Sequence, residues 1–266
     1  MEMLTYLQDN LKDGHIIRWP ESCFPLKFYI APFRWYAQKG NDAYRYHAMV
    51  QRALNEWEKV SGGKIRFKLV QTLNDSQINL DWQRVDRKAL GYCKFQDDNY
   101  RLYTGEIQIG LSDGILHQQY QSENEVYHTI LHEIGHALGL GHSPYKTDIM
   151  YTPHQYGTIN LSTRDAFTLQ TLYKLPIGIS VKELAQKHNI NSDNIDYIIT
   201  NSTGSKKSKG FENIKNSIKI PQKDLMTEQD KLAEIRKYNL GLQNIQISCD
   251  VKDYINKKII LPKDKQ

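Results

Sequence analysis

Cysteine is scarce in this chain of 266 residues, and its three cysteines stand far apart, at Cys23, Cys93 and Cys249. An odd number of cysteines without close spacing predicts that no disulfide framework holds the fold together. The chain also lacks a long apolar run, so we expect no membrane span. Its first residues, Met1 to Tyr6, contain neither a basic segment nor an apolar stretch of useful length, and we therefore identify no signal peptide.

Tryptophan is missing from the last part of the chain, because all four Trp lie before residue 83. Charge is unevenly distributed as well. The net charge is +5, and the whole excess lies in residues 177–266, which carry 16 basic and 11 acidic side chains. These shifts in composition predict a boundary near Leu175 and Pro176, with a domain over residues 1–176 and a basic C-terminal region over residues 177–266.

The stretch from His132 to His142 reads H-E-x-x-H-x-x-G-x-x-H. On a helix, His132 and His136 lie one turn apart on the same face. Gly139 then lets the chain turn back and bring His142 to the same point, since glycine adopts left-handed backbone angles without strain. Three imidazoles suit one zinc ion and leave a fourth position open for water, as in catalytic sites. Glu133 is better placed to accept the proton of that water than to bind metal.

The residues before this motif predict the helix that it needs. Ser122 and Glu125 have the spacing of a capping box. An apolar stripe follows at four-residue spacing, made of Val126, Ile130, Ile134 and Leu138. His128 lies one turn before His132 on the same face, and we interpret it as a packed or half-exposed helix residue rather than as a ligand.

A second signal, Asp148-Ile149-Met150-Tyr151, follows the motif, and the two together are the signature of the metzincins. With Ser143 directly after the third histidine, the chain most resembles the matrixin branch of these zinc endopeptidases, over roughly residues 15 to 176. The resemblance implies one catalytic zinc ion and a protein or peptide substrate. It also implies that Met150 packs beneath the metal without binding it.

Alternating apolar residues predict strands at 26–30, 65–70, 78–80 and 106–109, and a helical stripe predicts a helix from Asp42 to Val60. This order, with the helix of the motif, predicts an α+β fold. The resemblance implies a metzincin-like domain with a twisted mixed sheet, a long active-site helix, the Met-turn and a closing helix that begins at Ser162. It also implies that the last strand is the sheet edge to which a substrate peptide adds. The candidates for that edge are Gly105, Glu106 and Ile107.

Other candidate site residues follow from the resemblance or from residue type. Pro153 and Tyr156 come after the Met-turn and would wall the pocket for the substrate residue past the cut, although their spacing is wider than the family pattern. Calcium is a second cation to consider, with the loop carboxylates of Asp97, Asp98 and Asp113 as candidate ligands. Solvated carboxylates without an ion are the alternative for these three.

The C-terminal region repeats itself weakly. Two similar segments, at about 179–221 and 226–262, each end in an Ile-x-(Ile/Leu)-Pro stretch. A short helix, a turn, a second helix and a final strand would satisfy each segment, as a small α/β region. This resembles the lysin motif (LysM), which binds N-acetylglucosamine polymers, and it implies peptidoglycan or chitin as a partner. A plain α/β appendage or a partly disordered tail is the alternative.

The function that these patterns favour is that of a zinc metalloendopeptidase with Glu133 as its general base. The alternatives are a glycan-binding protein of the cell wall and a hydrolase of peptidoglycan cross-links, each directed by residues 177–266. We expect a monomer and no nucleic-acid partner. The location stays open, because the resemblance favours an extracellular or cell-wall protein, whereas the missing signal peptide favours a cytoplasmic one.

Overall fold

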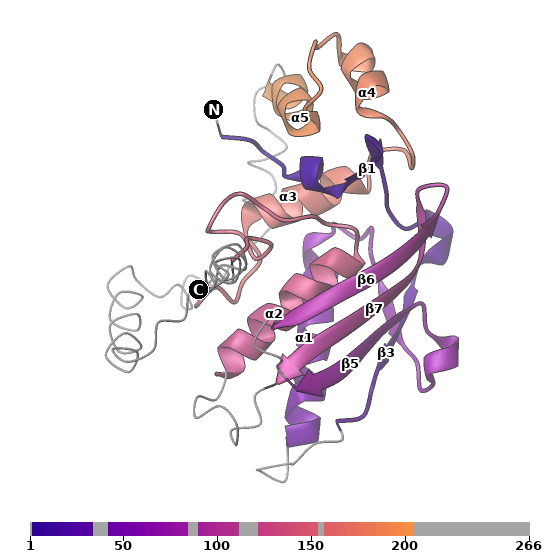
Figure 1. The fold of residues 1–266 in the computed structure, drawn as a ribbon, viewed down its shortest axis with the longest axis vertical. Helices are drawn as coiled ribbons and strands as arrows, with labels where there is room; N and C mark the ends of the chain where they lie inside the picture. The colour runs from indigo at the N-terminus through magenta and orange to yellow at the C-terminus, as the bar shows by residue number, and fades with distance from the viewer. Residues whose placement is uncertain (1, 34–41, 85–89, 112–121, 154–156, 205–266) are drawn as a thin grey trace, which may run out of the picture. The chain divides into compact units, whose positions relative to one another are not determined.

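A five-stranded mixed sheet with two helices packed behind it positions the residues of the motif (Figure 1). The structure is a computed structural model that describes residues 2–33, 42–84, 90–111, 122–153 and 157–204. All of these except Pro153 and Gly157 belong to one compact unit. The strands of the sheet are β3 (Leu26–Ile30), β4 (Phe67–Leu69), β5 (Ile78–Arg84), β6 (Gly91–Asp98) and β7 (Arg101–Leu111).

The strand order in the sheet is β4-β3-β5-β7-β6. The first four strands in this order are parallel, and β6 runs antiparallel to β7 as the first strand of a hairpin. The strands predicted from alternation are all present, so the α+β class is confirmed. Strand β6 was not predicted, and it takes the position at the edge.

The expectation that Gly105, Glu106 and Ile107 form the sheet edge is therefore wrong. These residues lie in β7, which pairs on one side with β5 and on the other with β6. Gly105, for example, is opposite Ile78 and also opposite Phe95. Both rows of backbone groups in this part of β7 are used within the sheet, so a substrate strand has nothing left to pair with there. The edge next to the motif belongs to β6.

Helices α1 (Asp42–Val60) and α2 (Glu123–Ala137) pack against each other, and α2 lies across β6 and β7. The predicted stripe of α2 is buried, with at most 2% exposure for Val126, Ile130, Ile134 and Leu138. Full burial of such a side chain contributes about 1.5–3 kcal/mol. Two buried tryptophans also fix α2, because the Nε1–H of Trp57 donates to Leu131 O at 3.0 Å and that of Trp19 donates to Ala137 O at 2.7 Å.

The remaining elements flank this core. They are the 3₁₀ helices η1 (Leu7–Asn10), η2 (Glu21–Cys23) and η3 (Leu73–Asp75), the short strands β1 (Leu11–Lys12) and β2 (His15–Ile16), and helices α3 (Thr163–Leu172), α4 (Val181–His188) and α5 (Ile195–Gly204). The closing helix predicted at Ser162 is α3, which has a complete capping box. Among the described residues, no helix is both long and apolar enough to cross a membrane.

The segment after Pro176 packs against the start of the chain. Val181 N donates to Gly14 O at 3.0 Å, and Ile16 N donates to Ile179 O at 3.0 Å. Helices α4 and α5 coincide with the two helices expected in the first repeat, whereas the rest of that region lies outside the described residues. The boundary predicted at Pro176 thus passes through a packed region, and the division of the chain there stays a prediction.

Candidate metal centre

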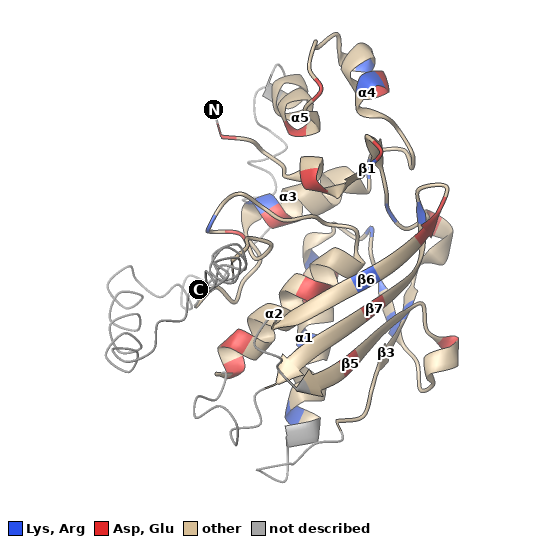
Figure 2. Ribbon diagram, in the orientation of Figure 1, with Lys and Arg blue, Asp and Glu red and all other residues tan. Residues whose placement is uncertain are grey.

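Local sequence signals set both ends of α2. The Ser122 hydroxyl accepts from Glu125 N at 3.3 Å, and the Glu125 carboxylate accepts from Ser122 N at 2.6 Å, which completes the predicted capping box. Acidic residues mark this first turn (Figure 2), where they also complement the helix dipole. At the other end, Gly139 has a φ of +91°, and the chain turns back as predicted.

The three histidines of the motif lie together, with ligand atoms all within 4.8 Å of one another. His132 Nδ1 lies 2.8 Å from Ile149 O, and His136 Nδ1 lies 2.8 Å from Leu140 O. A carbonyl oxygen can only accept, so each Nδ1 carries the proton and each Nε2 presents its lone pair. The two Nε2 atoms face each other at 3.1 Å.

This donor set fits zinc. Two lone pairs 3.1 Å apart repel each other unless a cation lies against both. Nitrogen ligands about 2.0–2.1 Å from a tetrahedral zinc ion are themselves about 3.3–3.4 Å apart, close to this separation. Burial lowers the pKa of His136 to about 4, and burial together with the neighbouring His136 lowers the pKa of His132 well below its ordinary value. Both rings are therefore neutral near pH 7, as metal ligands must be.

Glu133 projects from the same turn of α2 into a tightly packed place. The residue is 6% exposed, and its Oε2 has no hydrogen-bond partner among the described residues. Burial raises the pKa of this carboxyl to about 8 in the metal-free protein. A Cβ added at Gly91 of β6 would meet Glu133 Cγ and Oε1 at 2.9 Å, so only glycine lets β6 approach this closely. The edge strand and Glu133 are thus in contact.

The raised pKa of Glu133 leads to a first prediction, for the protein stripped of metal. Glu133→Gln should raise the free energy of unfolding by a few kcal/mol at pH 8, at about 1.4 kcal/mol per pKa unit. The folded state holds a proton on Glu133 up to pH 8, whereas the unfolded chain releases it near pH 4.5. Unfolding of the unchanged chain therefore becomes easier as pH rises between these values, and the amide variant escapes that loss.

Urea unfolding of both proteins with a chelator, at pH 5 and at pH 8, measures this difference. The difference in the free energy of unfolding between Glu133→Gln and the unchanged chain should be small at pH 5 and large at pH 8. An equal gap at both pH values would contradict the assignment of a buried, unpaired carboxyl at this position. Glu123→Gln is the matched control, since Glu123 stands in the exposed first turn of the same helix.

Met150 lies directly beneath α2 and is fully buried. A Cβ added at Gly135 would meet Met150 Sδ at 2.3 Å and Trp57 Cζ2 at 3.0 Å. The helix turn that carries the two histidines is therefore in contact with this methionine, and Gly135 makes the approach possible. The turn around Met150 is itself held, because Ser143 N donates to Met150 O at 2.9 Å and Asp165 Oδ2 accepts from Ile149 N at 2.9 Å.

The sequence model of the matrixins, a family of peptidases, matches residues 33–174, which is more than half of the chain. The chain belongs to the matrixin family. The matched segment contains four of the five strands of the sheet, α1, α2, the Met-turn and α3, whereas β3 lies just before it. The fold is accordingly metzincin-like, as the resemblance implied, and membership of this family implies zinc as the metal.

Viral proteins are among the relatives of this matrixin. A matrix metalloproteinase by name from Heliothis virescens ascovirus 3e is 24% identical over 160 residues, which cover 52% of this chain and 34% of the relative. Another from Trichoplusia ni ascovirus 2c is 26% identical over 129 residues, covering 41% and 25% of the two chains. One from Invertebrate iridescent virus 3 is 47% identical over 53 residues, covering 19% and 14%. The chain thus matches about a third or less of each of these relatives.

The family match ends at residue 174 and gives no support to the LysM resemblance of the C-terminal region. Two helices, α4 and α5, are not by themselves a lysin motif. Glycan binding by residues 177–266 of this matrixin therefore stays a prediction, and the described contacts of α4 and α5 give it no support.

Other predicted site residues stay predictions. Pro153 is exposed, and Tyr156 lies outside the described residues, so the pocket wall assigned to them stays a prediction. Of the candidate calcium ligands, Asp97 pairs with Lys12 at 2.6 Å, and Asp113 lies outside the described residues. Within the part of the chain that the structure describes, these carboxylates do not form a calcium site.

His128 packs as expected. It is 2% exposed, and its Nδ1 lies 2.6 Å from Thr158 O. Its ring stacks at 6.1 Å from the ring of His132, but the metal cluster does not include it.

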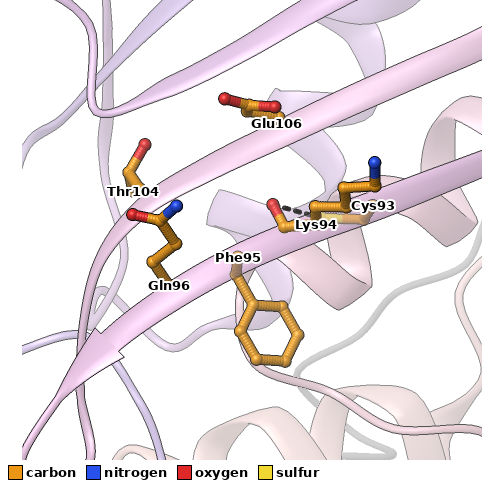
Figure 3. A pocket seen from close by; sticks show the side chains of 6 residues that line it. All are labelled: Cys93, Lys94, Phe95, Gln96, Thr104 and Glu106. Atoms are coloured by element: carbon orange, nitrogen blue, oxygen red, sulfur yellow. Dashed lines mark hydrogen bonds between the residues drawn. The ribbon is translucent and has the colours of Figure 1, made fainter.

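A shallow pocket of about 400 Å³ lies over the β6–β7 hairpin (Figure 3). Its lining residues are Cys93, Lys94, Phe95, Gln96, Thr104 and Glu106. In the strand register, Lys94 is directly opposite Glu106, and Gln96 is directly opposite Thr104. Residues opposite each other point to the same face of a sheet, so these four side chains share one face. Ile107 and Cys93, which is opposite it in the register, point to the other face of the sheet, the face that packs against α2. Most of this pocket therefore faces away from the histidines, and we do not assign the substrate site to it.

Sequence reasoning missed two features of the site. The first is β6, which crosses α2 beside Glu133. The second is Asp9, whose Oδ2 accepts from His142 N at 2.7 Å and lies 3.4 Å from His142 Nδ1. Asp9 stands 133 residues before His142. No spacing rule links them, and only the fold brings them together.

Proposed function

We propose that this matrixin is a zinc-dependent endopeptidase whose metal is held by His132, His136 and His142. The observation that carries the proposal is the cluster of these three side chains beside a buried, unpaired glutamate. Structural zinc sites use four protein ligands, whereas three ligands with an open position are typical of hydrolytic sites. A site of this kind without a neighbouring base would favour a structural role instead.

Each protein group has a distinct part in peptide hydrolysis. Zinc, when bound, would polarise the scissile carbonyl and lower the pKa of a water molecule. Glu133 accepts a proton from the attacking water and passes it to the nitrogen of the leaving amine. Glu133 must be ionised to accept that proton, and the positive charge of a bound zinc ion would favour the ionised form against the effect of burial. The Ile149 and Leu140 carbonyls orient His132 and His136 through their Nδ1 atoms.

We place the substrate peptide along the free edge of β6. Among the described strands, β6 is the last of the sheet on this side, and at Gly91 it touches the residue proposed as the base. A peptide that adds as a further strand would obtain main-chain hydrogen bonds from β6 and pass close to Glu133. Gly105 and Ile107, which were predicted to bind substrate directly, lie one strand further in and support β6 from behind. Hydrolysis of peptidoglycan cross-links or glycan binding is not favoured, because neither follows from the family or from a described contact.

The proposal predicts that the purified chain contains zinc and cleaves a mixed peptide library, with products read by mass spectrometry. A chelator should abolish cleavage, and added zinc should restore it. Cleavage that is unaffected by the chelator would contradict a metal-dependent mechanism. Zinc binding without any cleavage in the library would mean that the site does not hydrolyse peptides.

A further inference from the structure

The third histidine is the least enclosed of the three. His142 has a side chain that is 45% exposed, whereas His132 and His136 are partly buried and each lies within hydrogen-bonding distance of a backbone carbonyl. A side chain with that much freedom loses conformational entropy when a metal fixes it. Something other than burial has to hold its ring in place.

The group that contacts His142 is the carboxylate of Asp9 in η1. Its Oδ2 accepts the backbone N–H of His142 at 2.7 Å and stands 3.4 Å from the ring Nδ1. One oxygen thus contacts both the backbone and the ring of the same residue. A carboxylate that faces Nδ1 favours the tautomer with its proton on that atom and leaves Nε2 free, as for the other two histidines.

The preceding residue shows how close the two segments come. A Cβ added at Gly141 would lie 2.8 Å from the backbone carbon and the Cβ of Asp9, and 2.9 Å from its Oδ2. Any side chain at this position would push η1 away. Gly141 has no left-handed backbone angle, so the close approach is the reason that the position requires glycine.

The 3₁₀ helix that carries Asp9 is in turn held by α5. Asp196 is 5% exposed, and its carboxylate accepts from Thr5 Oγ1 at 2.6 Å, from Leu7 N at 2.6 Å and from Gln8 N at 3.1 Å. Ile195 N also donates to the side chain of Gln8 at 2.9 Å. These contacts fix the first turn of η1 just before Asp9. Helix α5 lies beyond the segment that matches the matrixins.

From these contacts we propose that Asp9 is a positioning residue for His142, and that Asp196 holds Asp9 in place. The inference rests on the proposed zinc site. According to this inference, η1 at the start of the chain and α5, which lies outside the family match, both help to position the third metal ligand. Neighbours that orient a ligand in this way commonly change metal affinity by about 10–100-fold when removed. The Asp9 side chain is 56% exposed, so we expect about tenfold, at the low end of that range.

The test uses the full chain and measures zinc affinity by competition with a chromogenic chelator. Asp9→Ala should weaken zinc binding about tenfold. Asp9→Asn should recover part of the loss, because an amide oxygen can still accept from both His142 groups. The visible spectrum of the cobalt-substituted protein should change in Asp9→Ala, since the geometry of the third ligand changes. A purely structural role of Asp9 would not alter that spectrum.

Asp193→Ala is the matched control, since it removes an exposed carboxylate from the turn before α5. Asp196→Asn should weaken zinc binding in the same direction as Asp9→Ala and lower the melting temperature. If Asp9→Ala binds zinc as tightly as Asp193→Ala while His142→Ala binds it weakly, the inference is overturned and the proposed function stands. If neither Asp9→Ala nor His142→Ala changes zinc binding, both are overturned.

Discussion

Replacing Glu133 by glutamine is expected to slow peptide cleavage by a factor of about 10²–10⁴ while zinc stays bound. The amide has the shape of the carboxylate but cannot accept the proton of the attacking water. Glu133 stands between His132 and His136 in sequence, yet it is not part of the histidine cluster. Its loss should therefore remove the base and leave the three ligands in place. Steady-state cleavage of a library-derived peptide, with zinc content measured on the same sample, tests this result.

Glu123→Gln makes the same chemical change ten residues earlier on α2. Glu123 is exposed and pairs with Arg45 at 2.6 Å, so this variant should cleave at the normal rate. Normal cleavage by Glu133→Gln would show that another group is the base. Loss of zinc from Glu133→Gln would instead show that the carboxylate helps to hold the metal.

His142→Ala is expected to weaken zinc binding by several kcal/mol, on the order of a thousandfold in the dissociation constant. Zinc sites with four protein ligands bind with about 10–16 kcal/mol, so one ligand accounts for roughly a quarter of such a total. Helix α2 ends at Ala137, before His142, and its capping box lies at the opposite end. The helix should therefore survive the change, and circular dichroism should show the usual helical signal.

Competition with a chelator measures this loss as well. His188→Ala serves as the control, because His188 is exposed near the end of α4 and the metal cluster does not include it. Equal affinities for the two variants would mean that His142 is an ordinary loop histidine. A helical signal that collapses together with zinc binding would mean that the turn at Gly139 also stabilises α2.

Local sequence was sufficient to predict the metal helix. The capping box at Ser122, the buried stripe that begins at Val126 and the left-handed Gly139 are all observed. Each of these signals depends on residues at most a few positions apart, where helix geometry fixes the spacing. The three histidines are within eleven residues of one another, so their convergence follows from a single helix and a single turn.

Strand order could not be predicted in the same way. Strand β6 has exposed or half-exposed residues along its whole length, so the apolar alternation by which strands were predicted is weak there. A sequence pattern without β6 predicts that the strand containing Gly105 is the edge of the sheet. The contact between Asp9 and His142 could not be predicted from the sequence either. It joins two segments by tertiary packing alone, and a lone aspartate in a short polar segment carries no signal of its own.

The hydrogen bonds between Asp196 and the start of the chain have a consequence for the order in which parts of the protein fold. These hydrogen bonds join residues that are 191, 189 and 188 positions apart in the sequence. The position of η1 therefore cannot be fixed until α5 has been synthesised. Contacts of such long range form late and slow the folding of a domain. On the ribosome, α2 and the turn to His142 would emerge and fold first. We therefore expect a nascent chain that carries two well-oriented histidines and a loose third one, and that binds the metal tightly only after α5 has been synthesised.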